Sequence, residues 1–325
     1  MTEIYLVRHA EAEGNAYRRI HGQYDSRVTE NGLLQVRALE GRLAGVRVDA
    51  CYASDLNRTC VTARAVYVPK GLTLRRDVRF REVNLGRWED TPFGWLEKFE
   101  PEAMHAFNHD PLHWAVEGSE RFEAYTQRFL EGMRQAAEEN DGKTIAIFSH
   151  GCVLRGVQYR LLGGQWPGYC DNTAVSRLRY ENGVFTVDEL NDASHVPEEI
   201  STFARQKWWR KEGDRRDFNM WFREDGDTFR AMLHDQEAGI VRCGADGTIH
   251  ELTMYEGYRG RRLGEQLIGC AVSRSRKNGA QQLRVTLPAD AREMSFYRRG
   301  GFVPEREADG RVTLVKSLRV PQESG

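Results

Sequence analysis

The stretch IYLVRHAEAEGN (residues 4–15) decides the fold of the first half of this chain. Residues 4–7 form a short, apolar, β-rich run, which is typical of a buried strand. The run leads directly into Arg8 and His9 and then into a polar turn. Ligands of parallel α/β sheets bind just beyond the carboxyl ends of the strands. This order of residues therefore predicts a binding or catalytic site at the end of the first strand.

A second stretch, KTIAIFSHG (143–151), repeats this arrangement much later in the chain. Its apolar run breaks at Ser149, His150 and Gly151. The two histidines are remote in sequence, so only the fold can bring them together. We expect His9 and His150 to meet at one edge of a shared sheet.

Helical and extended patterns alternate through residues 3–162. Apolar spacing predicts helices over 30–43, with Thr29 as the N-cap, over 57–66, over 121–139 and over 153–162. A further strand is predicted within DACYASD (49–55). Strands that alternate with helices favour an α/β layer fold with a largely parallel sheet.

Length and composition set the broad class. A chain of 325 residues is expected to form two domains. A net charge of -1 gives no overall attraction to nucleic acid or to an anionic membrane. No apolar run approaches the roughly 20 residues of a bilayer span, and no secretory signal precedes the first strand. We therefore expect a cytoplasmic protein, and nothing in the pattern specifies its oligomeric state.

The six cysteines show neither paired nor zinc-type spacing. We expect reduced and mostly buried thiols, without a disulfide framework or a metal site. They are Cys51, Cys60, Cys152, Cys170, Cys243 and Cys270.

The residues near the two histidines suit phosphoryl transfer. A ring nitrogen of histidine can attack phosphorus and form a covalent intermediate. Arg8 and Arg58 offer planar guanidinium forks that match phosphate oxygens, and a protonated second histidine would add charge. Glu82, in REVNLGRWED (81–90), could serve as the acid for the leaving oxygen.

The stretches that carry these residues resemble the sequence elements of a known family. LVRHAEAEGN is similar to the RHG signature of the histidine phosphatase, or phosphoglycerate mutase-like, superfamily, with Ala10 where the signature has glycine. Four later stretches resemble further elements of that family, in its order: RVTENGLLQVRAL, SDLNRTCVTA with Arg58, REVNLGRWED with Glu82, and IFSHGCVLR with His150. The resemblance implies a three-layer α/β/α domain, which we place at residues 1–196.

The resemblance also implies roles for single residues. His9 would become phosphorylated, and Glu82 would donate a proton to the leaving group and then activate water. Arg8, Arg58 and His150 would form the phosphate pocket, Asn15 would donate a hydrogen bond on the phosphate side, and His21 and Gln23 could lie near the substrate. The family needs no metal and no cofactor for this reaction.

The segment between the two histidines is short for a mutase, which must exclude water and usually needs a substantial lid. We therefore favour hydrolysis of a small phosphorylated metabolite (a sugar phosphate, a phospho-amino acid or a nucleotide-like ester) and keep a phosphomutase as the alternative. Trp88 and the aromatic residues of the loop over 91–120 are expected in the core rather than in a lid; those of the loop are Phe93, Trp95, Phe99, Phe107 and Trp114.

Composition changes near residue 196. The stretch 203–225 is dense in charged and aromatic residues and could be an interdomain helix or the first helix of a new domain. The pattern then predicts strands over 228–233, 239–244, 249–255 and 283–287, a long helix over 263–277 and a short one within 294–302.

The stretch YEGYRGRRLG (255–264) follows a predicted strand and opens the long helix. Glycines there let backbone N–H groups face an anion, and a helix N-terminus adds positive charge. The stretch resembles the acetyl-CoA-binding element of the GNAT acetyltransferase superfamily, with Arg262 in place of the middle glycine. MSFYRRGGF (294–302) resembles that family's FYxxxGF ending.

This second resemblance implies a smaller α+β domain, which we place at 197–325, that takes acetyl-CoA as co-substrate. The pyrophosphate would lie on the backbone of Arg259, Gly260, Arg261, Arg262, Leu263 and Gly264. Tyr297 could protonate the departing thiolate, and Glu251 is a candidate base for an acceptor amine. Acetyl transfer as the main activity, and a non-catalytic CoA sensor, are the remaining alternatives.

Overall fold

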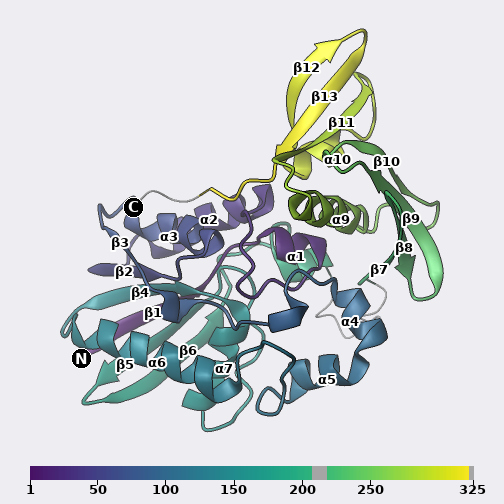
Figure 1. Ribbon diagram of the computed structural model, residues 1–325. Coiled ribbons are helices and arrows are strands. Elements are labelled where there is room, and N and C mark those ends of the chain that lie inside the picture. The colour runs from purple at the N-terminus through teal and green to yellow at the C-terminus, as the bar shows by residue number, and fades with distance from the viewer. Residues whose placement is uncertain (207–217, 322–325) are drawn as a thin grey trace.

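The apolar strand that opens the chain lies inside a six-stranded sheet. In the computed structural model, which describes residues 1–206 and 218–321, this strand is β1 (Thr2–Arg8). The sheet has the order β3-β2-β4-β1-β5-β6 (Figure 1). β1 runs parallel to β4 (Thr144–Ser149) and antiparallel to β5 (Val175–Glu181), which pairs with the edge strand β6 (Val184–Asp192). β2 (Ala50–Ala53) joins β4 to the short β3 (Leu74–Arg76) in the parallel part of the sheet.

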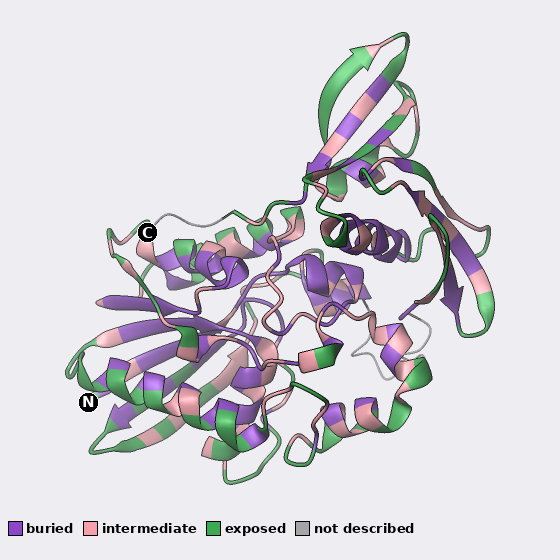
Figure 2. Ribbon diagram, viewed as in Figure 1, coloured by how far each residue is buried: buried purple, intermediate pink, exposed green. Residues whose placement is uncertain are grey.

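Both faces of β1 are buried, which explains its uninterrupted apolar sequence. Ile4 and Leu6 pack into one core, with residues of α6 (Phe122–Glu138) and α7 (Gly151–Leu161). Tyr5 and Val7 pack into another, with residues of α2 (Glu30–Leu43) and α3 (Asn57–Tyr67). Figure 2 shows these central strands buried between the helical layers. The expected three-layer α/β/α architecture is confirmed.

The helix expected over residues 30–43 is α2, and its range was predicted correctly. The hydroxyl of Thr29 accepts the N–H of Gly32 at 3.0 Å and caps α2 as expected. The face that packs on the sheet runs through Gln35, Leu39 and Leu43, whereas Leu33 and Leu34 are exposed.

The segment between β3 and α6 folds as short helices. They are the 3-10 turns η1 (Val78–Phe80) and η2 (Gly86–Trp88) and the helices α4 (Phe93–Phe99) and α5 (Pro101–His109). Trp88, Phe107 and Trp114 are buried, as expected. The expectation that Phe99 is a core residue was wrong, because its side chain lies at the end of α4 and is 49% exposed. Phe93 and Trp95 are only partly buried.

The second half contains two antiparallel sheets beside one long helix. The first has the order β10-β9-β8-β7, with β7 (Trp221–Asp225), β8 (Thr228–Leu233), β9 (Gln236–Cys243) and β10 (Ile249–Met254). The second has the order β11-β13-β12, with β11 (Gln282–Pro288), β12 (Val303–Ala308) and β13 (Arg311–Ser317). α9 (Gly264–Lys277) packs on both, and α10 (Met294–Arg299) leads into β12. Within the described residues, no helix is both long and apolar enough to cross a bilayer.

The expected helix within 203–225 was only partly right. A short helix, α8 (Thr202–Gln206), begins it, and residues 207–217 lie outside the described residues. Residues 221–225 form strand β7 rather than helix, because their backbone pairs with β8.

The two halves are joined through α1 (Glu13–Tyr17), which packs against α9 (Figure 1). Tyr17 belongs to the hydrophobic core of the second half rather than to that of the first. The buried carboxylate of Glu13 forms ion pairs with Arg276 at 2.8 Å and with Lys316 at 3.1 Å. The polar turn after the first strand therefore also serves as the domain junction.

Candidate active site

The two histidines meet at the carboxyl edge of the parallel strands. Arg8 of β1 pairs with Ser149 of β4, so the residues that follow, His9 and His150, emerge side by side. Their ring centroids lie 5.2 Å apart, and both side chains are buried. Neighbouring parallel strands thus bring together two residues that are remote in sequence.

His9 is held as a neutral imidazole with one free ring nitrogen. Its Nδ1 lies 2.7 Å from the carbonyl oxygen of Ala10, which can only accept, so Nδ1 carries the proton. Burial, followed by the nearby charges of Arg58 and Arg8, lowers the pKa of His9 well below its ordinary value of 6.5. The lone pair of Nε2 is therefore available to attack phosphorus.

His150 has the opposite tautomer. Its Nδ1 accepts a hydrogen bond of 3.1 Å from Nε of Arg58, so its proton is on Nε2. Burial, together with the charge of Arg58, lowers the pKa of His150 well below 6.5. Our expectation of a protonated second histidine is corrected, because the buried ring is neutral and contributes an N–H donor rather than a charge.

Three donors in this region lack acceptors among the described residues: Nε2 of His150, Nε of Arg8 and Oγ of Ser26, which lines the inner cavity. An unpaired buried donor costs about 1–3 kcal/mol. Donors of this kind beside a guanidinium fit an anion with several oxygens, such as a phosphoryl group.

Arg58 is fixed by backbone carbonyls. The side chain is 1% exposed and donates to the carbonyls of Tyr24 at 3.0 Å and Gly22 at 2.5 Å. The loop that carries these carbonyls is held in turn by Glu89, whose carboxylate accepts the N–H groups of Gly22, Gln23 and Tyr24. Glu89 therefore supports the pocket from outside it.

Glu82 lines the same cavity as His9, whereas His150 is fully buried and does not line it. Its carboxylate accepts the N–H groups of Cys152 at 2.9 Å and Val153 at 2.6 Å, at the start of α7, and the N–H of Val83 at 3.0 Å. These bonds fix the carboxyl group beside the residues that follow His150.

The other predicted residues differ in their placement. Asn15 and His21 line the cavity, and Nε2 of His21 lies 3.2 Å from the carboxylate of Asp90. Gln23 does not line it; its side chain lies behind Glu82 and donates to the carbonyl of that residue at 3.2 Å.

Sequence reasoning missed Asn172. This buried amide donates to the carbonyl of His9 at 2.8 Å and lies near the side chain of Asn15. A signal was available in DNTAV (171–175), where a polar turn precedes the apolar start of β5.

Two connected cavities begin at His9. The inner one is lined by His9, Arg58 and Glu82. The outer one shares six lining residues with it, which are Arg8, Asn15, Phe93, Phe107, Gly151 and Cys152. Phosphate would fit the inner cavity and the leaving group the outer one.

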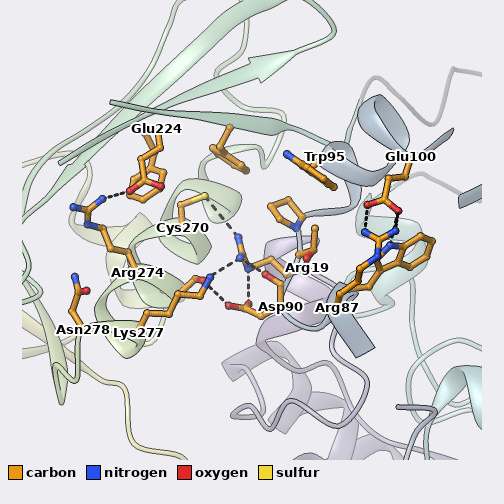
Figure 3. Close-up of a pocket in the computed structure, with 16 residues that line it drawn as sticks. Arg19, Arg87, Asp90, Trp95, Glu100, Glu224, Cys270, Arg274, Lys277 and Asn278 are labelled. Carbon is orange, nitrogen blue, oxygen red and sulfur yellow. Dashed lines mark hydrogen bonds and ion pairs between the residues drawn. The ribbon is translucent and has the colours of Figure 1, made fainter. Parts of the chain in front are cut away.

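A further cavity lies between the two halves of the chain (Figure 3). Arg19 donates to Asp90 on one side and, through Nη2, to Ser273 of α9 at 3.1 Å. Asp90 also contacts His21, so the domain junction reaches the wall of the inner cavity.

The loop that precedes α9 contains the residues that we predicted to hold the pyrophosphate. Gly260 and Arg262 have positive φ angles of 74° and 60°, and α9 begins without a side-chain cap. Arg262 is exposed, and it interacts electrostatically with Arg205 and with the carboxylate of Glu265 in the first turn of α9. Arg259 and Arg261 are exposed beside it, whereas Leu263 is buried.

Tyr297, in contrast, is packed in the core. Its ring is 3% exposed and lies 5.2 Å from those of Phe296 and Phe302. Burial raises its pKa to about 12, so the phenol keeps its proton. Glu251 is exposed on β10.

The described residues contain no cluster of three or more histidine, cysteine, aspartate or glutamate side chains suited to hold a metal ion. All six cysteines are free thiols, four of them buried.

Comparison with known proteins identifies both halves. Residues 4–193 match the histidine phosphatase superfamily (branch 1), and residues 191–313 match the acetyltransferase (GNAT) domain.

Two relatives and one solved structure illustrate the match of the first half. Phosphoserine phosphatase 1 of Hydrogenobacter thermophilus is 27% identical over 202 residues, which cover 61% of this chain and 96% of that protein. A probable phosphoglycerate mutase, GpmB of Yersinia pestis, is 28% identical over 60% of this chain and 95% of its own length. The structure of Bacillus stearothermophilus YhfR aligns with a TM-score of 0.58 and 31% identity, over 61% of this chain and all of that one.

The paired imidazoles, the arginine-lined cavity and these matches lead to one assignment: the chain belongs to the histidine phosphatase superfamily and carries a GNAT acetyltransferase domain after its phosphatase domain.

Proposed function

We propose that the first domain hydrolyses a small phosphomonoester through a phosphohistidine at His9, without a metal ion. The observation that carries the proposal is the pair of facing histidines with opposite tautomers. One offers a free lone pair at Nε2 and the other an N–H donor, beside the guanidinium groups of Arg8 and Arg58.

The reaction has two steps. Nε2 of His9 attacks phosphorus while the bond from phosphorus to the leaving oxygen breaks, and the carboxyl group of Glu82 gives its proton to that oxygen. Water then attacks the phosphohistidine, Glu82 takes back a proton, and the bond between phosphorus and Nε2 breaks to release phosphate. Arg8, Arg58 and Nε2 of His150 bind the equatorial oxygens throughout.

Hydrolysis is favoured over a mutase reaction because the outer cavity shares lining residues with the inner one and gives water a path to it. A phosphoserine phosphatase and a probable phosphoglycerate mutase are both among the relatives. Assaying free phosphate together with positional transfer on 3-phosphoglycerate distinguishes the two activities. Transfer without release would establish the mutase.

The direct test replaces His9 with alanine. We expect the variant to lose phosphate release from phosphoserine, ribose 5-phosphate and p-nitrophenyl phosphate alike, while the wild type retains activity in excess EDTA. Undiminished release by the variant would refute the nucleophile, and loss of wild-type activity with EDTA would refute the metal-free site.

We further propose that the second domain binds acetyl-CoA at residues 259–264. Support comes from the match of this domain to the GNAT family and from the positive φ angles and uncapped helix start of the loop. We keep residues 1–196 and 197–325 as the proposed extents of the two domains, close to residues 191–193, where the two family matches meet. Six free thiols fit a reducing compartment such as the cytoplasm.

Thermal unfolding with acetyl-CoA tests this binding. A valine at Gly260, where φ is 74°, distorts the loop, whereas a valine at Gly279, where φ is 78° and which lies after the far end of α9, provides an equally strained control. At 100 times its dissociation constant, acetyl-CoA should stabilise the wild type and G279V by about 2.7 kcal/mol, and G260V much less. An equal shift in G260V would place the ligand elsewhere.

Two further assays separate a catalyst from a sensor. Acetylation of a panel of amines would establish transfer. A change in phosphate release on adding acetyl-CoA, without acetylation, would establish a regulatory domain.

A further inference from the structure

Part of the wall of the outer cavity is formed by residues that follow the phosphatase domain in the chain. Phe203 and Gln206 of α8, and Asn219 just before β7, line it together with Phe93 and Phe107. All three follow residue 193, where the match to the phosphatase family ends. The alignment to the Hydrogenobacter relative covers 96% of that protein but only 61% of this chain. The substrate preference of such a relative therefore does not depend on a wall of this kind.

Specific hydrogen bonds fasten this wall to the catalytic domain. The amide of Gln206 donates to the carbonyl of Asn15 at 2.7 Å. Arg18 donates through Nε to Asn219 at 2.8 Å and through Nη1 to Gln206 at 3.3 Å. The guanidinium of Arg18 also stacks on the ring of Phe93 at 4.4 Å. The wall is therefore built into the rim of the site.

The wall completes a cluster of aromatic rings around the outer cavity. Trp166 and Tyr169 line it although each is about half exposed, at 50% and 51%. Their ring centroids are 6.0 Å apart, and Tyr169 lies 6.5 Å from Phe203, edge to face. The guanidinium of Arg155 lies over the ring of Trp166 at 5.7 Å. Exposed aromatic groups that converge on a cavity mark a ligand site.

We propose that this outer cavity binds a flat ring on the leaving group, so that the enzyme prefers ring-bearing phosphomonoesters such as nucleoside monophosphates to ring-free ones. Phe203 and Trp166 are the specificity-determining residues, and Phe203 is supplied by the chain beyond the phosphatase match. The proposal rests on the proposed phosphatase activity, because the phosphoryl group must lie at His9 for the leaving group to reach these rings.

A pair of substrates that differ only in the ring tests the idea. AMP and ribose 5-phosphate share the same phosphorylated sugar, and only AMP carries the adenine base. Stacking of one base on aromatic side chains favours the wild-type reaction with AMP by about tenfold in kcat/KM. Phe203→Ala and Trp166→Ala should each raise KM for AMP and reduce this preference severalfold. Because Phe203 also lies 5.7 Å from the guanidinium of Arg8, the ratio of kcat/KM for the two esters is compared rather than either rate alone.

The aromatic variants Phe203→Tyr and Trp166→Phe serve as controls, because they keep a ring and should retain the preference. A wild-type enzyme that hydrolyses both esters equally well would overturn the proposal. So would alanine variants that keep the preference, or that lose both activities in equal measure while the aromatic variants keep them. Failure to release phosphate from any ester would instead refute the phosphatase assignment itself.

Discussion

Replacing Glu82 with glutamine separates the two roles that the structure permits for this residue. Its carboxylate accepts three backbone N–H groups, those of Cys152 at 2.9 Å, Val153 at 2.6 Å and Val83 at 3.0 Å. A glutamine amide turns one oxygen into a donor, which leaves at least one of these N–H groups unpaired. An unpaired buried donor costs about 1–3 kcal/mol, so E82Q should reduce the free energy of unfolding by that amount.

The kinetic effect should depend on the leaving group. Loss of a general acid slows a reaction by about 10²–10⁴-fold when the departing oxygen needs a proton. Ribose 5-phosphate has such an oxygen, whereas p-nitrophenolate departs without a proton. The assay compares kcat/KM of wild type and E82Q for both esters, alongside urea unfolding.

Glu89→Gln provides the matched control. Its carboxylate also accepts several backbone N–H groups, yet Glu89 lines neither the inner nor the outer cavity. E89Q should be destabilised to a similar extent and should slow both esters equally. If E82Q also slowed both esters equally, Glu82 would be a structural cap of α7 and not the acid.

Two further predictions concern stability. Because burial holds the pKa values of His9 and His150 well below 6.5, the unfolded chain binds protons below that pH that the folded chain does not. The free energy of unfolding should therefore fall as the pH falls below 6.5, by up to about 1.4 kcal/mol per pH unit for each histidine. Urea unfolding at pH 7.5 and 5.5 measures this change. If the free energy of unfolding of His150→Gln depended on pH as strongly as that of the wild type, the prediction would be contradicted. At the domain junction, a Cβ on Gly269 would lie 2.5 Å from Cβ of Tyr17, so Gly269→Ala should cost about 1–3 kcal/mol. As a control, Gly41→Ala on α2, where a Cβ meets no other atom, should stabilise the folded protein by about 0.5–1 kcal/mol. Equal effects of the two substitutions on the free energy of unfolding would argue against tight packing of α1 on α9.

The positions of the two histidines could be predicted from sequence because the signal is local. An apolar run of four to six residues reports a buried strand, and a charged residue directly after it must lie at the sheet edge. The order of the elements then placed β1 and β4 in one sheet. The same reasoning identified α9 and the glycine-rich loop before it.

The charge state of His150 could not be predicted in this way. It depends on the depth of burial and on the approach of Nε of Arg58 to Nδ1 of the ring. Both are properties of the assembled site, because Arg58 and His150 come from different elements.

The outer wall of the cavity could not be predicted from the sequence either. Phe203 lies in a stretch dense in charged and aromatic residues, whose pattern fits a helix face or a domain core equally well. Its place beside the phosphatase site follows from long-range contacts such as the bond from Gln206 to the carbonyl of Asn15. Strand β7 was mistaken for helix for a related reason, since its pairing partner β8 decides its conformation.

The most direct test of the account is to trap the covalent intermediate. Wild-type enzyme mixed with a phosphomonoester and quenched within milliseconds in base should carry acid-labile phosphate on the peptide that contains His9, as mass spectrometry would show. Rapid release of phosphate with no modification at His9, or with the phosphate on another residue, would contradict the mechanism.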